Sequence, residues 1–554
     1  MKSFEGFRSV HARPSKALEA TRPLSRPARA GRSSLQGCKA LLGRDESSAD
    51  HLSAIGSQDA AAKRHVACAS TAMGGGLLEK TPVPTNGQQT MGPSARELKA
   101  AKERSRAKLV SSEDVTQNVH AVILAGGPSD NPMARYRAMP SMELGSNTQL
   151  IDVPISNCIR SGINKMYVLT QFNSHLLNAH VGRSYPPLVF GSPKTQGFVD
   201  VLACHQTPDY DSWYRGSADA VRRNLPVIME PHRGAGLPEE VVILSGQALY
   251  RMDYRELLAT HRQAGADVTI ATHSVGWGQA KLRGLARVDP DTGLVTDFSE
   301  KPAGPQLQRM AHASKHATPD YPFEASMGVY VFTRDALTRL LTENEEHFGT
   351  DAGPDTHFGH DVMPHALRAG LRVGAHHFGG YWREISTLRD FFEVNLELAS
   401  PTSPVSLFDV DDAIVSRGQM LPPAIMHRCQ ISNSLIGEGT VVQGSILSNS
   451  VLGCNAFIDN DCTIENSLIM GNDTYTNEPS RRRSREKGEA VLGIGSGTTI
   501  KNAIVDDNAA VGRNCMIANL EGVHEADRTQ AGYVIHDGIL LVLKGSVIAD
   551  NSKI

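Results

Sequence analysis

The sequence predicts two folded domains, a Rossmann-like α/β domain with a mainly parallel sheet and, after it, a parallel β-helix. The first observation is that short apolar runs alternate with helix-like segments between residues 119 and 334, which is typical of a parallel sheet covered by helices. The second is that an aliphatic residue recurs about every six residues between 452 and 517, which is typical of stacked β-helix coils.

The size and composition of the chain agree with this division and exclude several classes of protein. Its 554 residues exceed what one compact core usually holds, so two or three domains are expected. A net charge of −3 and a hydrophobic content of 40% give no overall attraction to nucleic acid or membrane. Because no apolar run reaches the ~18–20 residues needed to span a bilayer, we expect a soluble chain.

The N-terminal region differs in composition from the rest of the chain. Residues 1–75 are rich in Arg, Ser and Ala and poor in acids, which is typical of a disordered organelle transit peptide. Residues 76–117 form a predicted linker that is rich in Gly, Pro and Thr and ends in a loose, solvated helix. We then expect the α/β domain at 118–398, a second linker at 399–425 and the β-helix at 426–554.

Five buried strands are expected in the α/β domain, and their carboxyl ends predict where ligands bind. The strands lie within 118–127, 165–171, 240–246, 267–273 and 329–334. In open α/β sheets, ligands bind beyond the carboxyl ends of the strands. A nucleotide and a metal are therefore expected near Gly126 and Gly127 after the first strand, and near Gly246 after the third.

The β-helix prediction depends on where the aliphatic residues fall. We expect the interior to be filled by Leu452, Ile458, Ile464, Ile494, Ile500, Val505, Val511 and Ile517. An ordinary β-sandwich is the alternative. The segment 473–489 interrupts the repeat with five basic residues. We expect a solvated loop there, and a site for phosphorylated effectors is the alternative.

Dense stretches of sequence between 119 and 554 carry a resemblance to one enzyme family. They include LIDVPISNCIRSGINKMYVLTQFNSHLLNAH (150–180), WYRGSADAV (213–221), ILSGQALYRMDY (243–254), FSEKP (298–302), ASMGVYVF (325–332) and YWREISTLRDFFEVNL (381–396). These segments resemble ADP-glucose pyrophosphorylase, the glucose-1-phosphate adenylyltransferase. The segment HEADRTQAGYVIHDGILLVLKGSVI (524–548) resembles the plant and green-algal members in particular.

The resemblance implies both an activity and an assembly. It implies a nucleotidyltransferase domain followed by a left-handed β-helix that serves regulation and assembly. Such an enzyme joins ATP and glucose 1-phosphate to give ADP-glucose and pyrophosphate, with Mg²⁺, in starch synthesis in the chloroplast stroma. It also implies a heterotetramer in which large, regulatory subunits pair with small, catalytic ones.

The sugar side of the family's site is present in this chain. The resemblance places glucose 1-phosphate at Tyr214, Gly284, Glu300, Lys301 and Ser326. Lys301 matches the family's lysine for the sugar phosphate, where a compact cation is suitable, and Glu300 would accept sugar hydroxyls. One departure lies beside this group, because Arg283 replaces the family's usual aromatic residue.

The triphosphate loop departs further from the family pattern. The family's glycine-rich loop, whose backbone N–H groups cradle the triphosphate, corresponds here to GGPSDNPMARYRAMP (126–140). Its prolines remove backbone donors. Met139 stands where the family has its catalytic lysine, and Arg135 and Arg137 are candidate substitutes. The resemblance leaves as nucleotide-binding residues Gly126, Gly127, Gln206, Gly216 and Asp219.

The metal side is also altered. Gln247 stands where the family has an aspartate for Mg²⁺, and an amide offers an oxygen without charge to a hard dication. Glu384 keeps a carboxylate at the second metal position, whereas Arg383 places a positive charge where a metal would be bound. With Met139 and Gln247 at the family's catalytic positions, no catalytic residue is intact.

The regulatory positions are better preserved, and they favour one of three hypotheses. Lys501 and Lys544 match the two lysines that bind the activator 3-phosphoglycerate in plant enzymes, with phosphate as the other effector. The leading hypothesis is a regulatory subunit with impaired catalysis of its own. A catalytically competent adenylyltransferase with a compensated site and a non-enzymatic sugar-phosphate-sensing scaffold are the alternatives.

Overall fold

The computed structural model describes most of the chain after residue 117. The described residues are 116, 118–186, 197–205, 212–230, 237–311, 314–342, 356–407, 414–416, 421–475 and 477–554. The predicted transit peptide at 1–75, the predicted linker at 76–117 apart from residue 116, and Gln206 lie outside the described residues.

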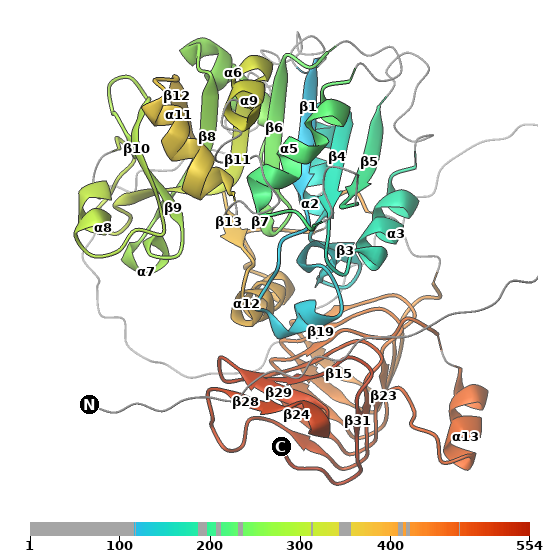
Figure 1. Ribbon diagram of the computed structural model, residues 1–554. Helices are drawn as coiled ribbons and strands as arrows, with labels where there is room; N and C mark the ends of the chain where they lie inside the picture. The colour runs from blue at the N-terminus through green and yellow to red at the C-terminus, as the bar shows by residue number, and fades with distance from the viewer. Residues whose placement is uncertain are drawn as a thin grey trace, which may run out of the picture. The chain divides into compact units, whose positions relative to one another are not determined.

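The α/β domain is built on a nine-stranded sheet (Figure 1). Its order is β10-β9-β11-β6-β1-β4-β5, with β8 beside β11 and β12 beside β8. Strands β6, β1, β4 and β5 are parallel, whereas β11 is antiparallel to β6 and β8. The strands are β1 (Val119–Leu124), β4 (Lys165–Thr170), β5 (Phe198–Ala203), β6 (Glu240–Ser245), β8 (Val268–Val275), β9 (Gly284–Val288), β10 (Val295–Glu300), β11 (Phe323–Thr333) and β12 (Val373–His377). The predicted α/β class is confirmed.

Helices cover both faces of this sheet. Along β1, Ala121 and Ile123 belong to one apolar cluster and Val122 belongs to another, as expected for a strand buried on both sides. The helices are α2 (Asp152–Arg160), α3 (His175–Ser184), α5 (Ser217–Ile228), α6 (Tyr254–Ala264), α7 (Trp277–Ala280), α8 (Pro305–Met310), α9 (Arg334–Thr342), α11 (Met363–Arg368) and α12 (Leu388–Ala399), with single turns η1 (Pro132–Arg135), η2 (Met139–Ser141) and η4 (Phe358–Val362). In the described part of the chain, no helix has the length and apolar character needed to cross a bilayer.

Two small antiparallel pairs lie beside the main sheet. They are β2 (Glu143–Leu144) with β3 (Thr148–Gln149), and β7 (Ala248–Tyr250) with β13 (Trp382–Glu384). The second pair joins the segment after β6 to a segment more than a hundred residues later, so it determines which side chains meet beyond the sheet.

The C-terminal domain is a parallel β-helix whose coils contribute to three sheets. The first holds β14 (Ile425–His427), β17 (Val441–Gln443), β20 (Phe457–Ile458), β23 (Gly493–Ile494), β26 (Ala510–Val511) and β31 (Val547–Ile548). The second holds β15 (Gln430–Ser432), β18 (Ile446–Ser448), β21 (Thr463–Glu465), β24 (Thr499–Lys501) and β27 (Met516–Ile517). The third holds β16 (Leu435–Ile436), β19 (Val451–Leu452), β22 (Leu468–Ile469), β25 (Ala503–Val505) and β30 (Ile539–Val542). Two further strands, β28 (Ala526–Arg528) and β29 (Tyr533–His536), extend this sheet in antiparallel fashion beside β30. The short turn η5 (Thr529–Ala531) connects β28 to β29.

The repeated aliphatic residues fill the interior of the coils. All eight predicted positions, from Leu452 to Ile517, are at most 3% exposed, so the β-helix is confirmed over the β-sandwich. Many corners of the coils are turned by residues with positive φ, which Asn and Asp tolerate better than other non-glycine residues. These corner residues include Asn433, Asn449, Asn455, Asp461, Asn466, Asn502, Asn508, Asn514 and Asn551.

The α/β domain and the β-helix share an apolar core. Leu388 and Phe391 of α12 belong to the same buried cluster as Leu468 of β22 and Leu541 of β30. Helix α12 begins at a capping box, in which Thr387 and Asp390 exchange hydrogen bonds. The helix therefore attaches the end of the α/β domain to the third sheet of the β-helix.

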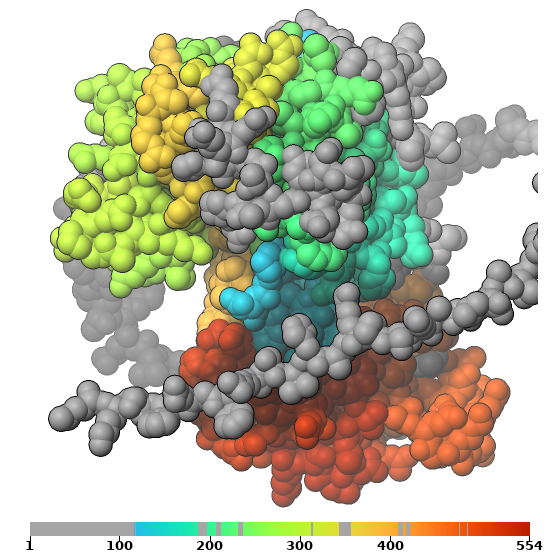
Figure 2. Space-filling view, viewed as in Figure 1, coloured from blue at the N-terminus to red at the C-terminus, as the bar shows by residue number. Residues whose placement is uncertain are grey.

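The interruption at 473–489 differs from the solvated loop that the sequence predicts. It contains a helix, α13 (Glu478–Glu486), that stands out from the side of the β-helix (Figure 2). One of its arginines, Arg481, is only 3% exposed, lies over the Phe457 ring and donates to the Leu492 carbonyl at 2.6 Å. Arg481 thus anchors the helix to the coils rather than being solvated.

Two neighbouring residues of β18 show how side chains alternate between the interior and the surface of the coil. Leu447 is 1% exposed in the interior, whereas Ile446 beside it is 46% exposed. We predict that Leu447→Ala lowers the free energy of unfolding of the β-helix by about 2–5 kcal/mol, since it leaves a cavity. The matched control Ile446→Ala should change it by less than about 0.5 kcal/mol in the same denaturant titration. Equal losses for the two variants would contradict the assigned register.

Candidate functional site

The glycines at which the sequence predicts a nucleotide and a metal follow β1 and β6, at the carboxyl ends of these parallel strands. Gly126 follows β1 and packs closely on the segment after β4, because a β-carbon at 126 would lie 2.9 Å from the backbone nitrogen of Gln171. Gly127 has open space beside it. The two glycines therefore allow a close approach of two loops, and only Gly127 has room for a ligand next to its Cα.

The loop after Gly127 folds as a short turn held by its own side chains. Asn131 accepts a hydrogen bond from the Met133 N–H at 3.0 Å and caps η1. Asn173 donates to the Ala134 and Arg135 carbonyls at 3.1 and 3.2 Å. Met133 is 1% exposed and anchors the turn in the core. The segment is therefore held as a turn by its own side chains, and part of it lines a cavity.

The structure corrects the suggestion that Arg137 substitutes for a lost catalytic group. Its side chain is 4% exposed, and the guanidinium pairs with two acids of the β-helix, Asp506 and Asp507, the second at 2.8 Å. Burial lowers its pKa, but the two carboxylates outweigh burial and the pKa is raised. Arg137 is thus held at the β-helix, while Arg135 lines a cavity of about 540 Å³ with the β28–β29 hairpin.

Met139, which the sequence resemblance is expected to place at a catalytic lysine position, is part of the hydrophobic core. It is 2% exposed at the start of η2 and belongs to the same apolar cluster as β1. A thioether in this position offers neither charge nor a hydrogen-bond donor to a phosphate.

The two predicted metal positions are brought together by the pairing of β7 with β13. Ala248 pairs with Glu384, and the Ile385 N–H donates to the Gln247 carbonyl at 2.8 Å. Gln247 and Glu384 are therefore neighbours, as the sequence predicts for two halves of one site.

The Glu384 carboxylate is paired with an arginine. Arg283 forms an ion pair with Glu384 through Nη1, and its guanidinium carbon lies 4.8 Å from the centre of the Trp382 ring. Burial lowers the pKa of Arg283. The sequence gives Arg283 only as a replaced aromatic residue, so its role beside Glu384 was missed.

The sequence predicts that Arg383 places its charge at the metal position, but the structure pairs Arg383 with α12. Successive side chains of a strand point to opposite sides, so Trp382 and Glu384 share one side of β13 and Arg383 points to the other. Arg383 pairs with Glu393 of α12 at 2.5 Å. Arg283 is therefore the cation that contacts Glu384, while the charge of Arg383 is near enough to lower the pKa of Arg283 further.

The predicted sugar-phosphate residues gather around the β9–β10 hairpin. Gly284 pairs with Glu300, and a β-carbon at 284 would lie 2.5 Å from Glu300 Oε2, so glycine leaves room for this carboxylate. Burial raises the pKa of Glu300. Lys301 follows with an exposed side chain and a φ of +47°, a conformation that costs about 1–3 kcal/mol and is often found at functional sites. Ser326 on β11 contacts the Tyr330 hydroxyl at 3.1 Å.

A segment that the sequence did not suggest joins the two halves of the site. Gly359 also borders the Glu300 carboxylate, and Gly216 packs against the Thr356 carbonyl with a φ of +93°. The Phe358 N–H donates to Ser217 Oγ at 3.1 Å. Residues 356–359 thus connect the start of α5 to Glu300.

Two other residues that the sequence predicts as ligand contacts, Asp219 and Tyr214, bond to neighbouring side chains of the protein. Asp219 is 4% exposed, pairs with Arg222 and Arg223 at 2.6 and 2.8 Å, and accepts from the Arg215 N–H at 2.9 Å, so its carboxylate fixes the loop before α5. The half-buried Tyr214 accepts from Asn224 at 2.8 Å. A direct nucleotide contact by Asp219 stays a prediction.

The two predicted effector lysines lie in different surroundings. Lys501 on β24 is exposed and pairs with Glu465 at 2.8 Å. Lys544 pairs with Asp507 at 3.3 Å and lies 3.9 Å from Asp473. Among the described residues, Lys544 and not Lys501 lines a cavity of about 410 Å³ between the two domains.

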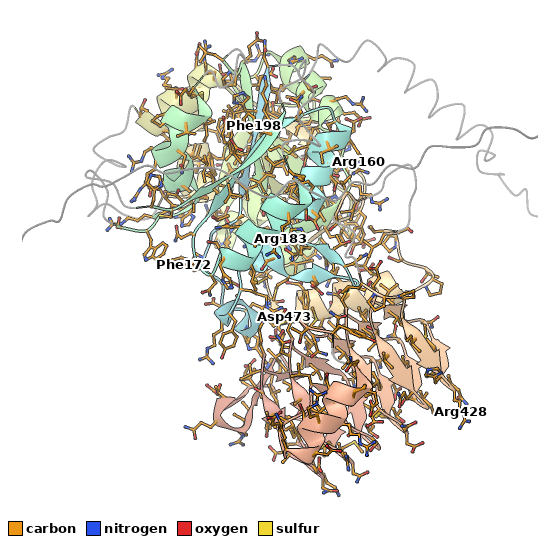
Figure 3. All side chains as sticks on the ribbon, turned by 90° about the vertical axis from the view of Figure 1, so that its right-hand side faces the viewer. Arg160, Phe172, Arg183, Phe198, Arg428 and Asp473 are labelled. Carbon is orange, nitrogen blue, oxygen red and sulfur yellow. The ribbon has the colours of Figure 1, made fainter. Side chains whose placement is uncertain are left out.

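That cavity has basic and acidic side chains from both domains. Arg183 of α3 and Asp473 of the β-helix, both marked in Figure 3, line it together with His180, Arg137 and Lys544. A polar cavity with several cations can hold an anion.

Comparison with known families adds to this geometry. The nucleotidyl transferase family matches residues 120–400, more than half of the chain, and the GLGC left-handed parallel beta-helix domain matches residues 419–552. This chain belongs to the nucleotidyl transferase family. With the two domains in this order, the nucleotidyl transferase fits the ADP-glucose pyrophosphorylase family, and the left-handed β-helix is confirmed.

The Mg²⁺ that this family implies does not fit the groups of this nucleotidyl transferase. A hard dication prefers carboxylate oxygens, and the two positions offer the amide of Gln247 and the carboxylate of Glu384. That carboxylate is engaged by Arg283, whose charge would oppose a metal at the same place.

The charge cluster around Arg137 gives this nucleotidyl transferase a testable pH dependence. Burial and Asp507 raise the pKa of Glu143 to about 8. The folded chain therefore holds a proton on Glu143 that the unfolded chain has lost, and stability should fall as pH rises from about 5 to about 8. In thermal unfolding between pH 6 and 8, Glu143→Gln should show a smaller decline in Tm than the wild type. The exposed Glu438→Gln is the control, and an unchanged slope in Glu143→Gln would contradict the assignment.

Proposed function

We propose that this chain is a large-type, regulatory subunit of ADP-glucose pyrophosphorylase that acts in starch synthesis in the chloroplast stroma. In this proposal it assembles with the small, catalytic subunit into a heterotetramer. The observation that carries the proposal is the ion pair between Arg283 and Glu384, beside Gln247, at the place where a catalytic member needs its metal. The Arg-rich composition of residues 1–75 supports the plastid location.

The reaction of the family explains why these changes matter. The phosphate oxygen of glucose 1-phosphate attacks the α-phosphorus of ATP, and pyrophosphate leaves. Catalysis comes from aligning two anions and neutralising their charge with metal and basic groups. Met139 is buried without charge, Arg137 is held by the β-helix, and Gln247 brings no charge to a metal. The losses therefore fall on the nucleotide and metal half of the site.

The sugar half and the effector positions support a retained binding role. Glu300 has the space it needs beside Gly284, and Lys301 is exposed with no acid paired to it among the described residues. The cavity that holds Lys544, where Arg137 and Arg183 lie together with acidic side chains, supports a site for 3-phosphoglycerate or phosphate, with Lys501 as the second predicted contact. Binding without turnover suits a subunit that tunes its partner.

The proposal predicts how the chain behaves alone and in the assembly. The isolated chain should form ADP-glucose at least about 10²–10³-fold more slowly than the small subunit, since removing one preorganised electrostatic group has an effect of that size. Co-expression with the small subunit should give a heterotetramer whose rate responds to 3-phosphoglycerate. The measurement is pyrophosphate release with and without the partner and the activator.

Two outcomes would contradict the proposal in different ways. Fast ADP-glucose synthesis by the isolated chain would favour the competent adenylyltransferase with a compensated site. Failure to assemble with the small subunit would favour the non-enzymatic sugar-phosphate-sensing scaffold.

A further inference from the structure

The guanidinium of Arg283 contacts two side chains of β13, the Trp382 ring and the Glu384 carboxylate. Trp382 and Glu384 occupy the same side of β13, so the ring and the carboxylate approach the guanidinium together. The side chain of Arg283 is 13% exposed and that of Glu384 is 33% exposed. The pair is thus largely sheltered but still open on one side.

This cation is permanent and fixed in place. An arginine keeps its charge across the physiological pH range, and stacking on an aromatic ring restrains its orientation. Its Nε is buried and has no hydrogen-bond partner among the residues that the structure describes. Because Nε is enclosed, a ligand would meet this guanidinium through its terminal Nη groups.

Arg283 also adjoins the predicted sugar-phosphate residues. Its carbonyl accepts a hydrogen bond from the Lys301 N–H at 3.0 Å, and the next residue, Gly284, pairs with Glu300. A phosphate held by Lys301 would therefore lie at the same end of the β9–β10 hairpin as the guanidinium.

We propose that Arg283 is the resident cation of this site and that the site binds phosphorylated sugars, such as glucose 1-phosphate or ADP-glucose, without a divalent metal. The guanidinium neutralises Glu384 and offers its remaining donors to phosphate oxygens, for which arginine is suited. A divalent ion would have to displace Arg283 from Glu384 with only Gln247 as a further ligand. The choice of ligand rests on the proposed function, whereas the metal independence rests on the arrangement around Glu384.

Calorimetric titration of the folded chain with ADP-glucose and with glucose 1-phosphate, in Mg²⁺ and in EDTA, tests the ligand side. For the wild type, at least one of the two should bind, with Kd values in Mg²⁺ and EDTA that agree within about twofold. Arg283→Gln should weaken binding about ten- to hundredfold, since it removes hydrogen bonds to a charged group. The matched control is Arg287→Gln, which removes an equal charge from an exposed position of the same strand, β9, and should leave Kd within about twofold.

Titration with Mn²⁺, followed by electron paramagnetic resonance, tests the metal side without any activity measurement. The wild type should bind no Mn²⁺ at this site. The double variant Arg283→Gln with Gln247→Asp frees Glu384 and adds a second carboxylate, so it should gain about one Mn²⁺ per chain. The gain should disappear when Glu384→Gln is added.

Several results would overturn the proposal. They are loss of wild-type ligand binding in EDTA, unchanged binding by a folded Arg283→Gln, no wild-type binding of either ligand, or Mn²⁺ binding by the wild type that Glu384→Gln removes. None of them decides whether the chain assembles with a catalytic subunit, so failure here is distinguishable from failure of the proposed function. Circular dichroism confirms that each variant is folded.

Discussion

The pairing of β7 with β13 is the constraint on which the site depends. It joins Gln247 to Glu384 across a long stretch of sequence, and the alternation of β13 sends Trp382 and Glu384 toward Arg283. A shift of one residue in this register would exchange Arg383 for Glu384 and remove the ion pair. The short two-stranded pair thus determines that Glu384 faces Arg283.

A second ion pair connects the site to the β-helix. Arg137 lies in the chain between η1 and η2, and its side chain is buried against Asp506 and Asp507. Asp507 also contacts Lys544, a predicted effector residue. An anion that competes for Lys544 would change the charge around Arg137, so the β-helix has a short physical connection to the loop after β1.

Much of the fold followed from the sequence because local patterns determine it. The apolar runs became β1, β4, β6, β8 and β11, and the hexad aliphatics fill the coils. Contacts between residues far apart in the chain could not be predicted, because no local sequence pattern indicates them. Arg283 beside Glu384, Gly359 beside Glu300 and Arg137 beside Asp506 each depend on how the chain returns on itself. Strand alternation, applied to β13, could have directed Arg383 away from the metal position.

In the proposed arrangement, this chain keeps a phosphorylated-sugar site while its own Arg283 closes the metal site. Crystals grown with ADP-glucose and Mn²⁺, measured at a wavelength where manganese scatters anomalously, test it most directly. We expect ligand density between Lys301 and Arg283 and no manganese peak beside Glu384. A manganese peak between Gln247 and Glu384, with Arg283 moved aside, would contradict it.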